Sequence, residues 1–438
     1  MADLLMQQAN QALDLAQAAG ADQVVAGVGQ GQSTDFTFRD GQLEQVQQSA
    51  SRGLQLILYV DGRYSTHNTT DLRPEALARF VADAVALTRH LQPDPFRQIT
   101  DPALYEGRAQ VELELVDEAV HRIGRDTCLD WLKAMDQAAR NDPRVVSASS
   151  QVSFGWQAGA RVSSNGFSGQ REGTQVGYGS GVTLDEGNGR RPEGHRYVHA
   201  RYLADLPAAE GAAVQALERA QARIGSQKGP SARTNMVVSR EAGGQLLGRL
   251  QEALSAAAIQ QNRSCLADKK DQAIAPAILS VTDNPHLRRG LSSRLYDGEG
   301  IAARPQAVIE GGVLRLFYTD TYYGRKLGWQ PTGGSASNLA FDLGDKGRDE
   351  LLAQAGEGYY VNSWLGGNAD MTSGDFSFGV QGHRIEDGQL GEPVGEMNIT
   401  GNYLDLLQNL AAVGNDPNPY SSLATPTLVF EGVEFSGQ

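Results

Sequence analysis

Cysteine is scarce in this sequence, which limits the kinds of fold that it can adopt. Only two cysteines, Cys128 and Cys265, occur among the 438 residues. A small secreted scaffold held together by disulfides needs several bridges, so that class is excluded. Cys128 lies in a helical pattern of apolar residues, where a cysteine commonly acts as a small buried side chain. This usage is typical of proteins in a reducing cytosol, and we expect a cytoplasmic location.

Long apolar runs and an excess of positive charge are also missing. No uninterrupted apolar stretch is long enough to cross a bilayer, and the N-terminus does not combine a basic segment with an apolar run as a secretory signal does. Lysine and arginine number 38 against 52 aspartates and glutamates, which gives a net charge of −14. Because contact with phosphates needs a basic face, we expect neither a membrane nor a nucleic acid as a direct partner. The total charge does not exclude a local basic patch at residues 269–270, 288–289 or 325–326, although a solvent-exposed face is the simpler interpretation of these residues.

Familiar signatures of catalysis or cofactor binding are scarce as well. No Gly-x-Ser-x-Gly elbow of a serine hydrolase occurs. Residues 27–31 and 177–181 alternate glycine with other residues, but neither stretch opens a helix, so strand or turn is favoured over a phosphate loop. His195 and His199 are separated by three residues that favour a strand, which would place them about 13 Å apart and disfavours a shared metal. Asp297 and Glu299 favour a turn with solvated acids over a catalytic pair.

The apolar residues that are present predict an α+β protein with two domains. Four segments have the apolar spacing of amphipathic helices, and the strands between them turn at Asp40-Gly41, Asp61-Gly62 and Asn165-Gly166. The expected helices cover residues 3–20, 74–90, 116–141 and 207–224. The glycine- and proline-bearing segment 225–230 interrupts the pattern. We therefore predict an N-terminal domain of helices packed on antiparallel strands at residues 1–225, and a second domain at residues 226–438.

The second domain is predicted to be a curved, mostly antiparallel β-sheet around one central helix, Glu241–Gln261. Residues 376–380 alternate apolar and polar side chains, which indicates a half-buried strand. A hairpin is expected around Gly311-Gly312, and a last strand after Leu428. Residues 403–413 have helical spacing.

Three stretches of the second domain carry a resemblance to a known family. They are Leu365-Gly366-Gly367 with Thr372-Ser373-Gly374-Asp375-Phe376-Ser377, then Ile399-Thr400-Gly401-Asn402, and Val413-Gly414-Asn415-Asp416. This set is similar to the C-terminal signature of the TldD/PmbA family, in which PmbA is also called TldE. Weaker similarity extends over nearly the whole chain. The resemblance implies a two-fold-like dimer that encloses a cavity and processes peptides.

The chain departs from the family at the zinc motif of the TldD subunits. Their helix carries His-Glu-x-x-x-His, and alignment on Leu246-Leu247 places Gly248, Arg249 and Ala253 at those three positions. The family also draws a cysteine ligand from the C-terminal tail, whereas residues 415–438 contain none. None of these side chains suits zinc or the activation of water. The resemblance to the PmbA/TldE branch therefore implies no metal and no catalytic residue here, with zinc in a TldD-type partner.

Three functions follow from this interpretation. The first is the non-metal subunit of a TldD/TldE-type metalloprotease that degrades or matures peptides and unfolded proteins, without cleaving them alone. The second is a stand-alone, non-enzymatic homo-oligomer that binds peptides. The third is a modulator of DNA gyrase, a name attached to the family, against which the acidic charge argues if direct DNA binding is meant. The candidates for lining a peptide groove are Tyr322, Arg325, Gly366, Gly367, Ser373 and Asp375.

Overall fold

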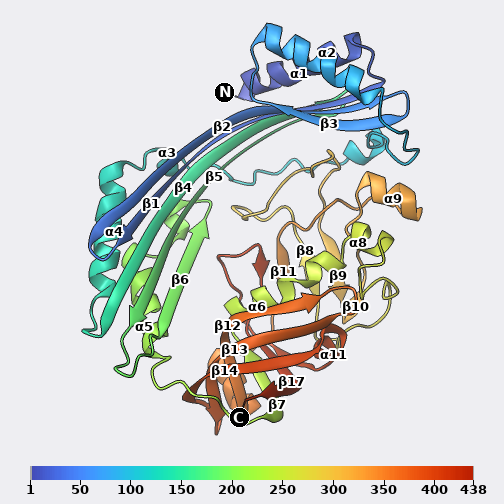
Figure 1. The fold of residues 1–438 in the computed structure, drawn as a ribbon. Helices are drawn as coiled ribbons and strands as arrows, with labels where there is room; N and C mark the ends of the chain where they lie inside the picture. The colour runs from blue at the N-terminus through green and yellow to red at the C-terminus, as the bar shows by residue number, and fades with distance from the viewer. Residues whose placement is uncertain (1, 438) are drawn as a thin grey trace.

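The computed structural model describes residues 2–437 and contains two units that face each other (Figure 1). The first unit is built on an antiparallel six-stranded sheet, called here the N-terminal sheet, with the order β3-β2-β1-β4-β5-β6. Its strands are β1 (Gln23–Arg39), β2 (Gln42–Val60), β3 (Arg63–Thr69), β4 (Val145–Ser163), β5 (Ser168–Leu184) and β6 (Glu193–Ala200). The predicted α+β class is confirmed.

The hairpin turns of the N-terminal sheet lie where the sequence predicts them. Asp40 and Gly41 both have positive φ, of 50° and 81°, between β1 and β2. Asp61 and Gly62 do the same between β2 and β3, with φ of 50° and 72°. Primed turns need such angles because their twist matches that of the strands, and an Asp-Gly pair accepts them at low cost.

Helices cover only the convex face of the N-terminal sheet (Figure 1). Near one end, α1 (Ala2–Ala18) and α2 (Pro74–Thr88) pack on Val24, Ala26, Leu56 and other side chains of the same face. Near the other end, α4 (Arg125–Ala139) and α5 (Ala209–Gln221) form a second core with that face. Two short 3₁₀ helices, η1 (Pro102–Tyr105) and η2 (Leu203–Asp205), lie in the connections. The concave face is turned toward the second unit.

The predicted helix at residues 116–141 is interrupted. The structure has α3 (Glu118–His121), a break, and then α4. Gly124 is the N-cap of α4, with φ of −98° and ψ of 167°, so its backbone is extended rather than helical. Glycine favours such a break because it gains nothing from helical packing and loses the most conformational freedom on being fixed.

The second unit contains a mixed sheet that closes into a barrel. The sheet order is β14-β13-β12-β7-β17-β15, and pairing of β14 with β17 closes it. Its strands are β7 (Ala232–Val238), β12 (Gly358–Asp370), β13 (Asp375–Glu386), β14 (Gln389–Asn402), β15 (Leu410–Val413) and β17 (Leu428–Ser436). The pairs are antiparallel except for β7 with β12, which is parallel. Residues 403–413, expected to be helical throughout, divide into α11 (Tyr403–Gln408) and β15.

A smaller five-stranded sheet of the second unit has the order β10-β9-β8-β11-β16. Its strands are β8 (Val281–Asp283), β9 (Gln306–Glu310), β10 (Val313–Leu314), β11 (Leu339–Phe341) and β16 (Leu423–Ala424). The predicted turn at Gly311-Gly312 joins β9 to β10. The neighbouring helices are α9 (Thr321–Leu327) and α10 (Arg348–Ala355).

The single central helix predicted at Glu241–Gln261 is three helices in the structure. They are α6 (Arg240–Gly248), α7 (Leu250–Ala253) and α8 (Ala256–Gln260). The first interruption is the single residue Arg249, whose backbone keeps helical angles, with φ of −64° and ψ of −32°. The second follows Leu254, where the hydroxyl of Ser255 caps α8 by accepting a hydrogen bond from the N–H of Ala257 at 3.2 Å. Within residues 2–437, no helix has both the length and the apolar character needed to span a bilayer.

Candidate functional site

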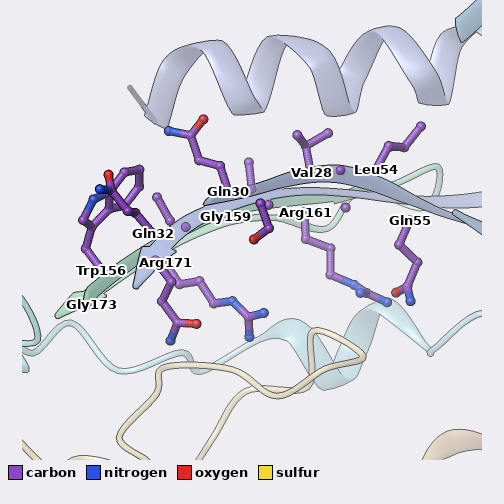
Figure 2. A pocket seen from close by; sticks show the side chains of 18 of the residues that line it. Val28, Gln30, Gln32, Leu54, Gln55, Trp156, Gly159, Arg161, Arg171 and Gly173 are labelled. Carbon is purple, nitrogen blue, oxygen red and sulfur yellow. The ribbon is translucent and has the colours of Figure 1, made fainter. Parts of the chain in front are cut away.

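A hollow of about 960 Å³ lies against the concave face of the N-terminal sheet (Figure 2). We call it the sheet hollow. Strands β1, β2, β4 and β5 form its floor, and the loop at residues 296–298 of the second unit forms part of the opposite wall. Because side chains alternate across a strand, the floor receives the residues that do not pack on α1 and α2. Those residues are glycine, glutamine, serine and arginine.

Glycines of the floor allow the strands to approach closely on the concave side. A side chain at Gly31 would begin 2.9 Å from the carbonyl oxygen of Trp156, and one at Gly155 would overlap the carbonyl oxygen of Gln32. The glycine strings at residues 27–31 and 177–181 lie within β1 and β5, as predicted. A larger side chain would crowd its neighbours at Gly31 and at the three glycines of the second string, but not at Gly27 or Gly29, where the nearest atoms are 3.8 and 3.9 Å away.

Arg161 and Arg171 point from the floor into the sheet hollow (Figure 2). They come from the neighbouring strands β4 and β5. Within residues 2–437, neither guanidinium takes part in a hydrogen bond or an ion pair, and the Nε atom of Arg161 is buried without a partner. Burial lowers the pKa of Arg161, while the charges of Asp297 and Glu299 act in the opposite direction. These two arginines were not among the candidates from the sequence. The feature that could have pointed to them is the polar or glycine residue at every second position of their strands, which indicates a polar face of the sheet.

The two acids opposite the floor are already bonded within their own unit. Asp297 accepts hydrogen bonds from the N–H groups of Glu299, Ile301 and Gly334 at 2.8, 3.0 and 3.1 Å. Glu299 accepts bonds from the N–H and the hydroxyl of Thr321, both at 2.8 Å. Burial raises the pKa of Glu299. The turn is present, but the expectation that its acids are solvated is wrong, because both side chains are largely enclosed and organise the loop.

A second, larger hollow lies between the two units, and we call it the β6–α6 groove. It has a volume of about 1520 Å³, with β6 and α5 on one side and α6, β12 and β13 on the other. Glu241 at the start of α6 is bridged by Arg196 of β6 and by Arg219 of α5, the latter at 2.8 Å. Burial alone would raise the pKa of Glu241, but these arginines lower it overall. This ion cluster fixes α6 to the N-terminal sheet.

Arg223 and His383 lie further along the β6–α6 groove. The Nη2 of Arg223 donates to the hydroxyl of Ser363 at 2.8 Å, and burial lowers the pKa of Arg223 to about 10. Burial also lowers the pKa of His383, and the charge of Arg223 adds to that effect. His195 and His199 line the same groove from β6, a strand as predicted. No group of three side chains able to hold a metal ion occurs within residues 2–437.

The positions of the TldD zinc motif surround the break between α6 and α7. Arg249 is exposed, Gly248 is partly exposed, and Ala253 is fully buried in the core of the barrel. Neither Gly248 nor Ala253 has a side-chain donor atom, and the positive charge of Arg249 would repel a cation. The residues present at these positions therefore do not fit zinc.

The six groove candidates lie in separate places. Gly366 and Gly367 form a bulge of β12 beside a hollow of about 370 Å³, which shares Leu365 with the β6–α6 groove. Ser373 and Asp375 belong to the exposed turn that leads into β13, where Ser373 donates to Asp375 at 2.8 Å. Hydrogen bonds from Asn402 and Ser373 lower the pKa of Asp375.

The remaining two candidates lie on α9. Tyr322 donates to Asp94 at 2.9 Å, and the guanidinium of Arg97 lies 3.5 Å above its ring. Arg325 is exposed on the same helix. The structure therefore uses Tyr322 to join the two units and does not gather the six residues around one groove.

Comparison with known proteins assigns most of the chain to one family. Three domain profiles match, described as PmbA/TldA metallopeptidase domain 1 at residues 24–88, central domain at 119–224 and C-terminal domain at 231–437. The chain belongs to the PmbA/TldD family. Metalloprotease PmbA of Escherichia coli O157:H7 is 27% identical over 405 residues, which cover 91% of this chain and 89% of that protein. A zinc metalloprotease TldD homolog of Saccharolobus solfataricus is 32% identical over 177 residues, covering 37% of this chain and 40% of that protein.

Solved structures of the PmbA/TldD family share the architecture. A Bacteroides thetaiotaomicron protein that bears the name modulator of DNA gyrase is 36% identical, with a TM-score of 0.95, 99% of this chain and 98% of that chain covered. TldE of Thermococcus kodakarensis has a TM-score of 0.87 at 18% identity, with 98% and 100% covered. The second likeness concerns the fold alone.

Proposed function

We propose that this chain is the metal-free subunit of a cytoplasmic TldD/TldE-type metallopeptidase complex that processes or degrades peptides and unfolded proteins. The partner is a TldD-type subunit with an intact His-Glu-x-x-x-His motif, which supplies the zinc. The observation that carries the proposal is the set of side chains at the family's motif positions, where Gly248 and Ala253 have no donor atom and Arg249 is positively charged. Peptide hydrolysis by zinc needs ligands and a base that these positions do not offer.

Two features of the molecule support a role as a subunit rather than as a free enzyme. The fold is kept over its full length despite the altered motif. The polar sheet hollow and the β6–α6 groove both remain open, as expected of a subunit that helps to hold substrate while its partner cleaves it. Obligate partners of this kind commonly bury more than about 2,000 Å² in their interface.

The test is a pull-down of the tagged full-length chain from cells of its own organism, with the captured proteins identified by mass spectrometry. We expect a TldD-type chain at close to equal stoichiometry, and zinc-dependent cleavage of an unfolded protein only when both chains are present. Sedimentation of the purified chain serves as the second measurement. A homo-oligomer that captures no such partner would support the stand-alone peptide-binding function. Capture of gyrase subunits instead would support the modulator function named for the Bacteroides relative.

A further inference from the structure

We propose that Arg161 and Arg171 bind a carboxylate of an extended peptide that lies across the floor of the sheet hollow. The inference rests on the proposed function and gives this chain a substrate-holding site of its own. The ligand chemistry is a carboxylate next to peptide N–H and C=O groups. Either the C-terminus of a peptide or an Asp or Glu side chain provides it.

The first argument is that both arginines have unused hydrogen-bonding capacity. Buried polar groups in proteins nearly always have a partner, so the buried Nε of Arg161 calls for one. Arg171 is exposed toward the hollow and is not engaged by any residue from 2 to 437. A guanidinium presents several N–H donors in a planar fork that matches a carboxylate, and such pairs are among the stronger hydrogen bonds.

The second argument is that the chain does not neutralise this charge at close range. Asp297 and Glu299 are the acids whose charges act on Arg161, but their oxygens already accept bonds from main-chain N–H groups and from Thr321. The positive charge of Arg171 also repels that of Arg161 and lowers the pKa of Arg161 further. An incoming carboxylate would relieve this repulsion in a partly desolvated site, where such interactions are stronger than in water.

The third argument is the shape of the floor. Arg161 lies across Gly27, with its Nη1 atom 3.8 Å from the place where a side chain would begin, and Arg171 lies across Gly159 with Nε at 3.7 Å. Glycine thus keeps the floor flat beside each guanidinium, so a peptide main chain can approach. Gln55, Gln157 and Gln175 border the same hollow, and an amide side chain both donates to and accepts from a peptide group.

A nucleic acid is the less suitable occupant. Phosphate-backbone binding relies on many neutralised phosphates, whereas only three arginines, Arg161, Arg171 and Arg201, are among the described residues that line this hollow, in a chain with a net charge of −14. The volume of about 960 Å³ is also of the size that holds a compact ligand or a short peptide stretch.

The test uses the full-length chain and four fluorescent peptides of one neutral, unstructured eight-residue sequence. One has a free C-terminus, one is amidated, one is amidated with a central Glu, and one is amidated with a central Gln. We expect binding of the first peptide, the third, or both, at least about tenfold tighter than the two uncharged ones. The first and third peptides distinguish the terminal from the side-chain carboxylate. Binding should also weaken as salt is raised.

The variants Arg161→Gln and Arg171→Gln should each abolish that preference, whereas Arg79→Gln, an exposed arginine of α2, should keep it. Arg171 is the safer test of the two because its exposed side chain is not part of a core. Equal binding of all four peptides, or equal affinity of Arg171→Gln and Arg79→Gln, would overturn the inference. So would tighter binding of oligo-dT that depends on Arg161. The pull-down of a TldD-type partner by Arg171→Gln is a separate readout, so the proposed function can stand if this site fails.

Discussion

The phenolic hydroxyl of Tyr403 donates a 2.9 Å hydrogen bond to the main-chain carbonyl oxygen of Leu246, which is 157 positions away in the sequence. Tyr403 begins α11, directly after the signature stretch at residues 399–402. Leu246 lies in the last turn of α6, two residues before Gly248. The signature stretch of the family therefore holds the end of the helix at which the metal-binding subunits carry their motif. The same ring packs against Phe376, with centroids 5.1 Å apart.

Removing the Tyr403 hydroxyl should destabilise the chain. Tyr403 is fully buried, so Tyr403→Phe leaves the carbonyl of Leu246 without that donor in a place where water does not replace it. We expect a loss of about 1–3 kcal/mol in the free energy of unfolding, measured by urea denaturation. Tyr197→Phe is the matched control because that ring is 59% exposed. Equal stability of the two variants would contradict the role assigned to the hydroxyl.

The second prediction concerns zinc. After dialysis against a weak chelator and repletion with zinc, the purified chain should hold far less than one ion per molecule by elemental analysis, because positions 248, 249 and 253 lack ligands. A TldD-type partner treated in the same way should hold about one. Stoichiometric zinc with chelator-sensitive peptidase activity in the chain alone would refute the proposed metal-free role.

The environment of Ala253 gives the third prediction. Its side chain is fully buried in the core of the barrel, so Ala253→His would overpack that core and cost about 1–3 kcal/mol of unfolding free energy. Arg249→Glu changes an exposed position and should stay within about 0.5 kcal/mol of the wild type. Thermal or urea unfolding of the two variants measures the contrast. If both were neutral, the neighbourhood of the motif could accept a metal ligand more readily than the structure indicates.

Local features of this fold could be predicted from the sequence, and long-range ones could not. The Asp-Gly turns follow from the positive φ that primed turns require, and they were placed correctly on both sides of β2. The continuity of β2 was missed: the sequence indicates a strand at residues 42–48 and another at residues 54–60, whereas residues 49–53 between them are mostly exposed and show no apolar alternation. A strand segment that is held only by hydrogen bonds to its neighbouring strands, with no buried face, leaves no apolar pattern in the sequence from which it could be predicted.

The candidate site shows the same limit. The alternating glycines were correctly interpreted as strand, but the face that they occupy depends on where α1 and α2 pack. Arg161 and Arg171 meet through the pairing of β4 with β5, which local spacing does not reveal. The breaks within residues 240–260 were missed because their apolar residues keep helical spacing. The cap that Ser255 provides to α8 begins a new helix inside this pattern, and spacing alone does not reveal it.

A pH dependence is expected from His383. Burial and the nearby charge of Arg223 lower its pKa in the folded chain below the ordinary value of 6.5, so the unfolded chain takes up a proton first as the pH falls. Stability should therefore decrease as the pH falls below about 6.5 toward the pKa of the folded state, and should be unaffected by this group at higher pH. Urea midpoints of wild type and His383→Gln between pH 5 and 8, about the range in which histidine titrates, measure the effect. The variant should lose less stability on acidification; identical slopes would contradict the prediction.

The curvature of the N-terminal sheet gives the last prediction. A side chain at Gly155 would overlap the carbonyl oxygen of Gln32 and begin 3.1 Å from the Cα of Ser33, both of which are backbone atoms of β1 that cannot rotate away. Gly155→Ala should therefore cost about 1–3 kcal/mol of unfolding free energy. Gly211 in α5 is the matched control, since a side chain there would meet nothing within 4 Å and alanine favours a helix. Gly211→Ala should be stabilising by about 0.5–1 kcal/mol. Urea denaturation of both variants measures the two changes in unfolding free energy. No loss of stability in Gly155→Ala would contradict the prediction, because it would show that the strands can separate at this point and that the curvature there does not depend on glycine.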